Sequence, residues 1–262
     1  MLFAIDIGNT NIHAGLFDGS SREPIAHFCL GSDERRSADE YALVLSLLLQ
    51  RNACDADGID GVIIGSVVPT LTDTVMTAVR SFTGAPVTVI GPGVKTGFPI
   101  RLSDPAELGA DIAANTAGAI DAVGYPAIVI AFGTATVVSV VDESGAFQGA
   151  SILPGVRMSF DALGETGLLK PVSGGTKTPI VGKSTEEAIR SGVLRGQLLA
   201  VTGLAEQYKK TLALPDSTPV IVSGGSAEAL LPLLPKTYRH IPLLSLCGLC
   251  AIDRLNKRKR QE

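Results

Sequence analysis

Apolar and polar positions alternate along the first 90 residues in a way that predicts strands and helices of one α/β domain. Apolar runs at 2–7 and 12–17 flank the polar turn Gly8-Asn9-Thr10-Asn11, which predicts a β-hairpin. A third strand is predicted at 25–30. Ser37 and Glu40 form a capping box before a helical repeat of leucines. The rest of this half predicts helices at 40–51 and 70–82 and strands at 61–68 and 86–90.

The second half of the chain repeats this order. Apolar strands are predicted at 127–130, 137–142 and 146–153, and the first two flank the turn 133–136, which contains Gly133 and Thr134. Each half therefore begins with a β-meander that carries a hydroxyl-bearing glycine turn, as an internal duplication would produce. We predict two domains, 1–122 and 123–262, whose glycine turns face each other across a nucleotide cleft. The remaining elements are helices at 112–123, 158–163, 188–212 and 246–257 and a strand at 220–222.

Two carboxylates stand out by their positions. Asp6 lies inside an apolar strand directly before the glycine turn, where a carboxylate needs a cation or hydrogen-bond donors. The turn could hold phosphate and Asp6 a divalent metal ion, although an ordinary hairpin with a capped Asp fits these residues equally well. Asp111 falls in the first turn of a predicted helix, where the helix dipole steadies a carboxylate. Taken alone, Asp111 is better explained as a plain acid at the start of a helix.

Composition narrows the class of protein. The chain has 262 residues, 45% of them hydrophobic, and a net charge of −4, so we expect a large core and no binding of nucleic acid. We find no secretory signal or long apolar stretch, and we expect a cytoplasmic protein that does not enter membranes. Cys247 and Cys250 have CxxC spacing within an apolar helical pattern, which predicts buried small residues. The basic residues 254 and 257–260 predict a solvated, frayed tail.

Seven ordered motifs across essentially the whole chain resemble the type III pantothenate kinase family of the actin and sugar-kinase superfamily. They are Asp6-Ile-Gly-Asn-Thr-Asn11, Ser66-Val-Val-Pro69, Pro105-Ala-Glu-Leu-Gly-Ala-Asp111, Phe132-Gly-Thr-Ala-Thr136, Pro154-Gly155, Gly182-Lys-Ser-Thr185 and Ser223-Gly-Gly225. The resemblance implies two ribonuclease-H-like (actin-like) domains, each a mixed β-sheet flanked by helices. It also implies a homodimer that uses ATP to phosphorylate pantothenate to 4'-phosphopantothenate, the first step of coenzyme A biosynthesis.

The resemblance also assigns roles to individual residues. Asp6 would hold Mg²⁺, and Asp111 would accept the proton of the attacking hydroxyl. The residues that would bind ATP are Asp6, Ile7, Gly8, Asn9, Thr10, Asn11, Ile12, His13 and Thr134. The residues that would contact pantothenate are Gly109, Ala110, Asp111, Ile112 and Thr185.

Four positions depart from the family pattern. The family has an Asp at Ala131 that binds a monovalent cation, an Arg at Ile112, a Thr at Val137 and a Tyr near Leu102. Without the Asp, we predict that K⁺ or NH₄⁺ does not activate this chain as it activates its relatives. The departures leave two alternatives to an active pantothenate kinase. One is a catalytically weak paralogue that binds nucleotide as a regulatory protein, and the other is a kinase for another hydroxylated acid.

Overall fold

A computed structural model describes residues 1–19, 21–165 and 178–258 of the chain. The chain forms two compact units, and the first contains Met1–Phe98, Ser103–Asp121 and the C-terminal segment that begins at Leu244. The second contains Pro99–Leu102 and Ala122–Leu243. The sequence-based division at 122/123 lies beside the break at Asp121, but the chain returns to its first unit at the end. Each unit is described by itself below.

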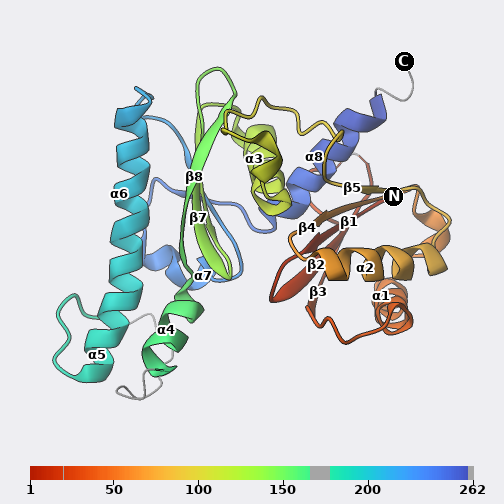
Figure 1. The fold of residues 1–262 in the computed structure, drawn as a ribbon, viewed down its shortest axis with the longest axis horizontal. Helices are drawn as coiled ribbons and strands as arrows, with labels where there is room; N and C mark the ends of the chain where they lie inside the picture. The colour runs from red at the N-terminus through yellow and green to blue at the C-terminus, as the bar shows by residue number, and fades with distance from the viewer. Residues whose placement is uncertain (20, 166–177, 259–262) are drawn as a thin grey trace. The chain divides into compact units, whose positions relative to one another are not determined.

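The first unit is built on a five-stranded sheet in the order β3-β2-β1-β4-β5 (Figure 1). Its strands are β1 (Leu2–Ile7), β2 (Asn11–Phe17), β3 (Ala26–Gly31), β4 (Gly61–Ser66) and β5 (Val87–Val89). The first three strands pair antiparallel, whereas β4 and β5 run parallel to β1. The predicted hairpin, third strand and later strands are therefore confirmed, with shifts of one or two residues at their ends.

Helices α1 (Ala38–Arg51) and α2 (Pro69–Phe82) bury their apolar stripes in the core of this unit. The core side chains of β1 alternate with side chains on the opposite face, as expected of a strand covered on both sides. The predicted capping box is present, because Ser37 accepts from the Glu40 N–H and Glu40 accepts from the Ser37 N–H. Pro69 occupies the first turn of α2, where its missing N–H costs no hydrogen bond.

The opposite face of this sheet carries glycines that let helix α8 (Leu244–Arg258) lie close to the strands. A Cβ atom added to Gly15 would lie 3.0 Å from Leu246 Cδ1, and one added to Gly65 would lie 3.0 Å from Leu249 Cδ2. Glycine inside a strand commonly marks such a close approach. The apolar side of α8 thus packs directly on β2 and β4.

Helices α3 (Ala110–Val123) and α8 cross in close contact at two glycines. A Cβ added to Gly248 would lie 1.7 Å from the Ala114 carbonyl oxygen, and one added to Gly118 would lie 2.5 Å from the Leu244 carbonyl oxygen. Such spacing lets the two backbones touch, as small residues do at helix–helix contacts. The crossing fixes the start of α3 relative to the start of α8.

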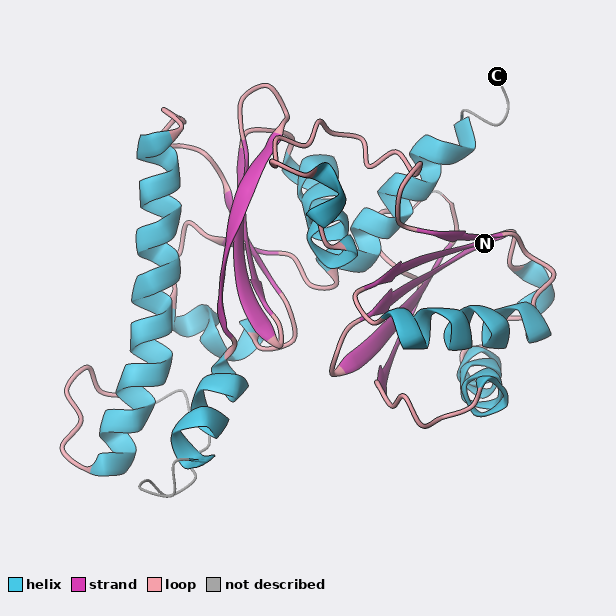
Figure 2. Ribbon diagram, viewed as in Figure 1, coloured by secondary structure: helices cyan, strands magenta, loops and turns pink. Residues whose placement is uncertain are grey.

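The second unit repeats the topology of the first, with sheet order β10-β9-β6-β7-β8. Figure 2 shows the strands of both units in magenta and their helices in cyan. Its strands are β6 (Ala127–Phe132), β7 (Ala135–Val141), β8 (Phe147–Pro154), β9 (Val220–Ser223) and β10 (Arg239–His240). An antiparallel meander again leads to two parallel strands. The predicted internal duplication is confirmed at the level of topology. The sequence analysis missed β10, because a strand of two residues leaves no periodic pattern.

The helices of the second unit are α4 (Val156–Glu165), α5 (Thr185–Arg190), α6 (Gly196–Thr211) and α7 (Ala227–Leu230). A π-helical segment, Ser191–Arg195, joins α5 to α6, so the helix predicted at 188–212 has a change of winding near its start. Ser184 caps α5 by accepting from the Glu187 N–H. The sequence at 164–183, which has two prolines and several glycines, predicts a loop, and most of it lies outside the described residues.

The C-terminal basic residues differ from the predicted solvated tail. Helix α8 continues to Arg258. Arg254 of this helix forms a salt bridge with Asp121 at 3.0 Å, and Lys257 forms one with Asp253 at 3.0 Å. Residues 259 and 260 lie outside the described residues. Cys250 is buried and Cys247 partly so, as the apolar pattern predicted. Of the helices described, none is long and apolar enough to span a bilayer.

The glycine crossing allows a direct test of packing. Gly248→Ala places a methyl group against the Ala114 carbonyl oxygen, so we expect a loss of roughly 2–3 kcal/mol in the free energy of unfolding. Gly84→Ala, two residues after the end of α2, is the control, because nothing lies within 4 Å of its added Cβ and its φ is not positive. Alanine there should change the free energy of unfolding by less than about 1 kcal/mol. Urea unfolding measures both, and equal effects would contradict the packing account.

Candidate functional site

The turn between β1 and β2 presents polar groups outward and is held in shape by its own backbone. The Gly8 N–H donates to the Asn11 carbonyl at 3.0 Å. Ser32 ties the turn to the end of β3, because its hydroxyl donates to the Gly8 carbonyl at 2.6 Å and its N–H to the Thr10 carbonyl at 3.0 Å. The side chains of Asn9, Thr10 and Asn11 are exposed. This turn has the hydrogen-bonding groups that a phosphate requires.

Asp6 sits on β1 two residues before Gly8, and its carboxyl group is largely withdrawn from water. Its cross-strand neighbours are Gly65 on β4 and His13 on β2. Burial raises the pKa of Asp6 to about 6; the hydroxyl of Ser245 acts against this rise, and the negative charge of Asp111 adds to it. The first unit therefore contains a carboxyl group that is costly to ionise without a cation.

Asp111 lies in the first turn of α3, as predicted. Burial raises its pKa, and the backbone N–H groups of Ile112 and of Asp111 itself oppose that rise. A Cβ added to Gly109 would lie 2.7 Å from Asp111 Oδ1, so glycine leaves the space that the carboxylate uses. A Cβ at Gly65 would lie 3.9 Å from the Ala110 Cβ, which places the start of α3 beside β4.

The structure thus brings Asp6, Asp111 and the glycine turn into one unit, where the two carboxyl groups interact through their charges. Among the described residues, no three His, Cys, Asp or Glu side chains are gathered to hold a metal ion. The two carboxyl groups of Asp6 and Asp111 fit the ligand preference of Mg²⁺, which usually takes one or two carboxylates and fills its other positions with water and substrate phosphates. Two partly buried acids beside a polar glycine turn could therefore place a metal ion and accept a proton.

The corresponding turn of the second unit, between β6 and β7, carries Thr134 with its side chain exposed. Gly155 donates its N–H to the Thr134 carbonyl at 3.1 Å, and a Cβ at Gly155 would lie 2.1 Å from that oxygen. Gly224 has a φ of +98°, and its added Cβ would lie 2.5 Å from the Phe132 carbonyl oxygen. Both glycines are needed for close packing under this turn.

Two of the departures from the family pattern are direct neighbours in the second sheet. Ala131 on β6 pairs with Val137 on β7, and Ser223 on β9 is its partner on the other side. Cross-strand partners share a face of the sheet, so a methyl group and an isopropyl group stand side by side there. Neither can coordinate a cation.

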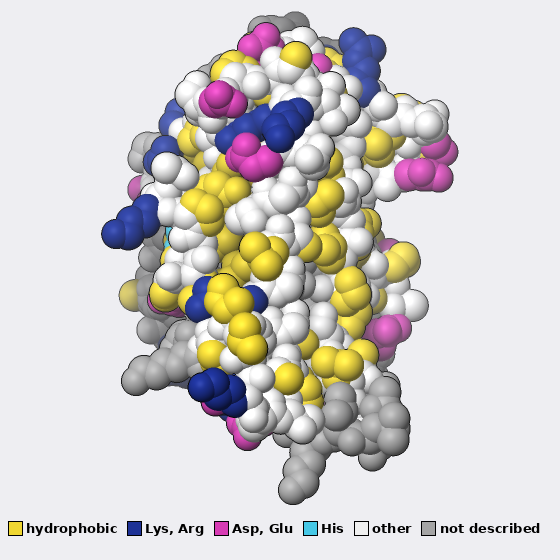
Figure 3. Space-filling model, turned by 90° about the vertical axis from the view of Figure 1, so that its left-hand side faces the viewer, with side chains coloured by type: hydrophobic (Ala, Val, Ile, Leu, Met, Phe, Trp, Pro, Cys, Tyr) yellow, Lys and Arg dark blue, Asp and Glu magenta, His cyan; other side chains and the backbone are white. Residues whose placement is uncertain are grey.

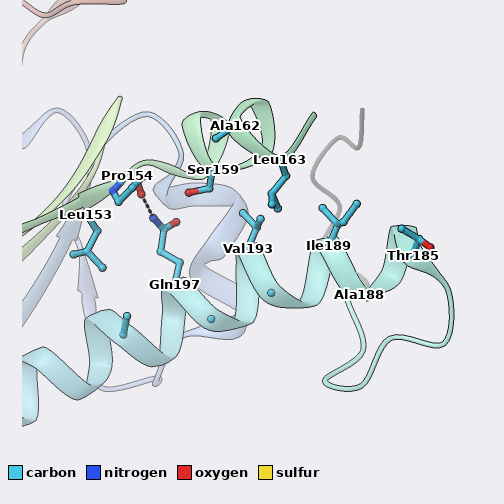
Figure 4. Close-up of a pocket in the computed structure, with 13 residues that line it drawn as sticks. Leu153, Pro154, Ser159, Ala162, Leu163, Thr185, Ala188, Ile189, Val193 and Gln197 are labelled. Carbon is cyan, nitrogen blue, oxygen red and sulfur yellow. Dashed lines mark hydrogen bonds between the residues drawn. The ribbon is translucent and has the colours of Figure 1, made fainter. Parts of the chain in front are cut away.

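Thr185 occupies a different part of the second unit. It lines a mainly apolar groove of about 710 Å³ between α4 and the α5–α6 helix (Figure 4). In this groove Gln197 Nε2 donates to the Pro154 carbonyl at 2.6 Å. Apart from Thr185, none of the predicted site residues lies among the described residues of its lining.

Sequence reasoning missed Ser32 and Ser245. Ser32 follows β3 directly, and β3 pairs with the hairpin. A hydroxyl at that place in the sequence could have indicated a hydrogen bond to the turn. Ser245 is distant from Asp6 in the chain and reaches it through the first turn of α8. No local pattern indicates that contact.

The raised pKa of Asp6 predicts a pH-dependent stability in metal-free buffer. The carboxyl group of Asp6 has a pKa of 3.8 in the unfolded chain and of about 6 in the folded chain. Between these two pH values the unfolded chain has already released the proton that the folded chain still holds, so the free energy of unfolding falls as pH rises. Asp6→Asn removes the buried charge. We expect the variant to gain roughly 1–3 kcal/mol relative to the wild type between about pH 4 and about pH 7. Urea unfolding with a chelator measures this, and the same gain in the exposed control Asp73→Asn would contradict it.

Comparison with known proteins agrees with the motifs and the fold. The sequence model described as type III pantothenate kinase matches residues 2–207. Proteins named type III pantothenate kinase from Streptomyces griseus subsp. griseus and Moorella thermoacetica are 38% and 37% identical over 256 and 250 residues. These alignments cover 95% of this chain in both cases, and 96% and 97% of the relatives.

Solved structures support the same fold class. The activator of the 2-hydroxyisocaproyl-CoA dehydratase from Clostridium difficile, with bound ADPNP, superimposes with a TM-score of 0.55 and 12% identity over 100% of this chain and 97% of that one. Ethanolamine utilization protein EutJ from Carboxydothermus hydrogenoformans has a TM-score of 0.53 and 14% identity, over 95% and 89% of the two chains. The predicted fold class, two mixed sheets flanked by helices, is confirmed. The chain belongs to the type III pantothenate kinase family.

Proposed function

We propose that this protein transfers the terminal phosphoryl group of ATP to the primary hydroxyl of pantothenate, which yields 4'-phosphopantothenate for coenzyme A biosynthesis. One observation carries the proposal. Within a chain of this family, the buried carboxyl groups of Asp6 and Asp111 interact in the same unit as a polar glycine turn. Phosphoryl transfer depends mainly on positioning and charge neutralisation, and these groups supply both.

Asp111 would act as the general base. Its carboxylate would accept the proton of the attacking hydroxyl while the oxygen approaches the phosphorus atom. Burial raises its pKa above the ordinary value, which makes the carboxylate a better proton acceptor. The N–H groups at the start of α3 oppose that rise and favour the ionised form. Gly109, Ala110 and Ile112 surround this carboxylate along the chain, and we assign them to the pantothenate-binding segment.

Asp6 would hold Mg²⁺, and the ion when bound would neutralise the charge of the phosphates. The stretch from Asp6 through Ile7, Gly8 and Asn9 to His13 would bind the nucleotide. The exposed side chains and N–H groups of the turn would donate to phosphate oxygens, while Ser32 keeps the turn in shape from behind. The Ser245 hydroxyl favours the ionised form of Asp6, which is the form that a cation requires.

In the second unit we assign Thr134 to the nucleotide and Thr185 to pantothenate. The exposed Thr134 hydroxyl belongs to a turn that Gly155 and Gly224 hold tightly, so it has a fixed place from which to donate. Thr185 stands at the first position of α5, after its cap Ser184. Both assignments follow the residue-by-residue match to the family.

We also infer that the protein is a cytoplasmic homodimer. The surface of α6 and the preceding π-helical segment supports self-association. Three glycines on it are exposed and have open space at Cβ, namely Gly192, Gly196 and Gly203. Leu199, on the same helix, is 70% exposed. Figure 3 shows apolar side chains spread over this face of the molecule. Small residues at such spacing let two helices approach closely. Sedimentation equilibrium gives the mass that tests this inference.

Removal of the proposed base tests the function directly. Asp111→Asn keeps the size of the side chain but removes its ability to accept the proton. We expect ADP formation that depends on pantothenate to fall by roughly 10²-fold or more, the scale of general-base catalysis, while ATP still binds. Near wild-type turnover in the variant would contradict the assignment. If the wild type itself forms no ADP with pantothenate, the proposed substrate is wrong.

Because Ala131 and Val137 are apolar, we predict that monovalent cations do not change the turnover of the protein. A bound K⁺ needs several oxygen ligands and commonly a carboxylate to balance its charge, and neither side chain offers one. We expect the same turnover in Na⁺, K⁺ and NH₄⁺ buffers of equal ionic strength, which controls for general salt effects. Saturable activation by K⁺ over Na⁺ would show that other groups serve the ion.

A further inference from the structure

Three side chains of types that can bind transition metals share one face at the edge of the first sheet. His13 lies on β2, and His27 and Cys29 lie on β3. In the antiparallel register His13 is opposite Cys29, and His27 is opposite Gly15, two residues further along. Cross-strand partners point to the same face, and so do residues two apart on one strand. The three side chains therefore form a small triangle on this face.

Two of these side chains already meet. His13 Nδ1 and His27 Nε2 are 3.1 Å apart, and their ring planes are 12° from parallel. Two imidazole nitrogens that bind one ion at roughly 2.0–2.1 Å lie roughly 2.9–3.4 Å apart for the usual bond angles. The ion lies to one side of the line that joins the nitrogens, so each ring must turn slightly. Because His27 is exposed and His13 only partly buried, both rings have room to do so.

A local movement of Cys29 would bring a third ligand to the two rings. Opposite residues of an antiparallel pair have Cβ atoms roughly 4.5–5.5 Å apart, so the Cys29 Cβ lies within reach of an ion held by His13. As they stand, no three such groups among the described residues are gathered closely enough to hold an ion. Rotation about the Cα–Cβ bond of Cys29, which is exposed, would turn its sulfur toward the two rings.

We propose that His13, His27 and Cys29 bind a divalent transition-metal ion such as Zn²⁺. The imidazoles bind as neutral rings, so the proton that the two rings share moves to a ring nitrogen that faces away from the ion. The Cys29 thiol releases its proton to water when the metal–sulfur bond forms. Three protein ligands leave one position of a tetrahedral ion for water.

The donor set separates this site from the proposed magnesium site. Imidazole and thiolate prefer zinc and related ions, whereas Mg²⁺ prefers oxygen ligands. Asp6 is opposite His13 in the sheet, so its carboxylate adds a favourable charge without belonging to the set. His13 also falls in the stretch assigned to ATP, and zinc binding should therefore be measured without nucleotide.

Titration of the full chain, freed of any purification tag, with Zn²⁺ alone tests the proposal. We expect one equivalent to bind, and Mg²⁺ not to compete. Loss of a group that merely holds a metal ligand in place weakens metal binding by about 10- to 100-fold. His27 is a direct ligand in this proposal, so His27→Gln should weaken zinc binding by at least that factor. His240→Gln is the matched control, because His240 is the third histidine of the chain and lies in the second unit. It should bind zinc as the wild type does.

Cys29→Ser gives a second, nearly isosteric test, with Cys54→Ser as its control. Titration with Co²⁺ should produce a thiolate-to-cobalt charge-transfer absorption that Cys29→Ser alone abolishes. Asp6→Asn should still bind zinc, which keeps this test independent of the proposed kinase site. Wild-type zinc affinity in both His27→Gln and Cys29→Ser, or no zinc binding by the wild type, would overturn the proposal.

Discussion

The close crossing of α3 and α8 is the constraint on which the candidate site depends. Asp111 stands at the start of α3 and Ser245 at the start of α8, and both act on the carboxyl group of Asp6. The two helices hold these positions because Gly118 and Gly248 allow their backbones to touch. Any side chain at Gly248 would overlap the Ala114 carbonyl oxygen, so the helices would have to separate. A change in packing would then become a change in the electrostatics of Asp6.

The same crossing explains why two acids can be buried together. Placing carboxylates of like charge in one unit is unfavourable, and both pKa values are raised by burial. The fold offsets only part of this cost, through the Ser245 hydroxyl and the N–H groups at the start of α3. What remains would be offset by a cation together with the phosphates it accompanies. Under the proposed function, this loss of stability falls at the place where a cation would bind.

Local sequence patterns predicted most of the elements, because strand alternation, the Ser37–Glu40 capping box and Pro69 act within a few residues. The repeat of the glycine turn even predicted the common topology of the two sheets. Contacts between distant segments left no such pattern. The return of α8 to the first unit, the Ser245 contact and the pairing of Arg254 with Asp121 join residues more than one hundred positions apart. The neighbouring places of Ala131 and Val137 likewise required the register of the sheet.

The duplication makes Asp6 and Ala131 equivalent positions with different electrostatic needs. Asp6 on β1 and Ala131 on β6 occupy equivalent places, each two residues before the glycine of its turn and each paired with the second strand of its meander. The partners across the sheet are Gly65 and Ser223, again at matching positions. A partly buried carboxylate requires a compensating positive charge, and a methyl group requires none. Of these two equivalent positions, Asp6 alone therefore creates an electrostatic demand for a cation, and Ala131 leaves its turn stable without one.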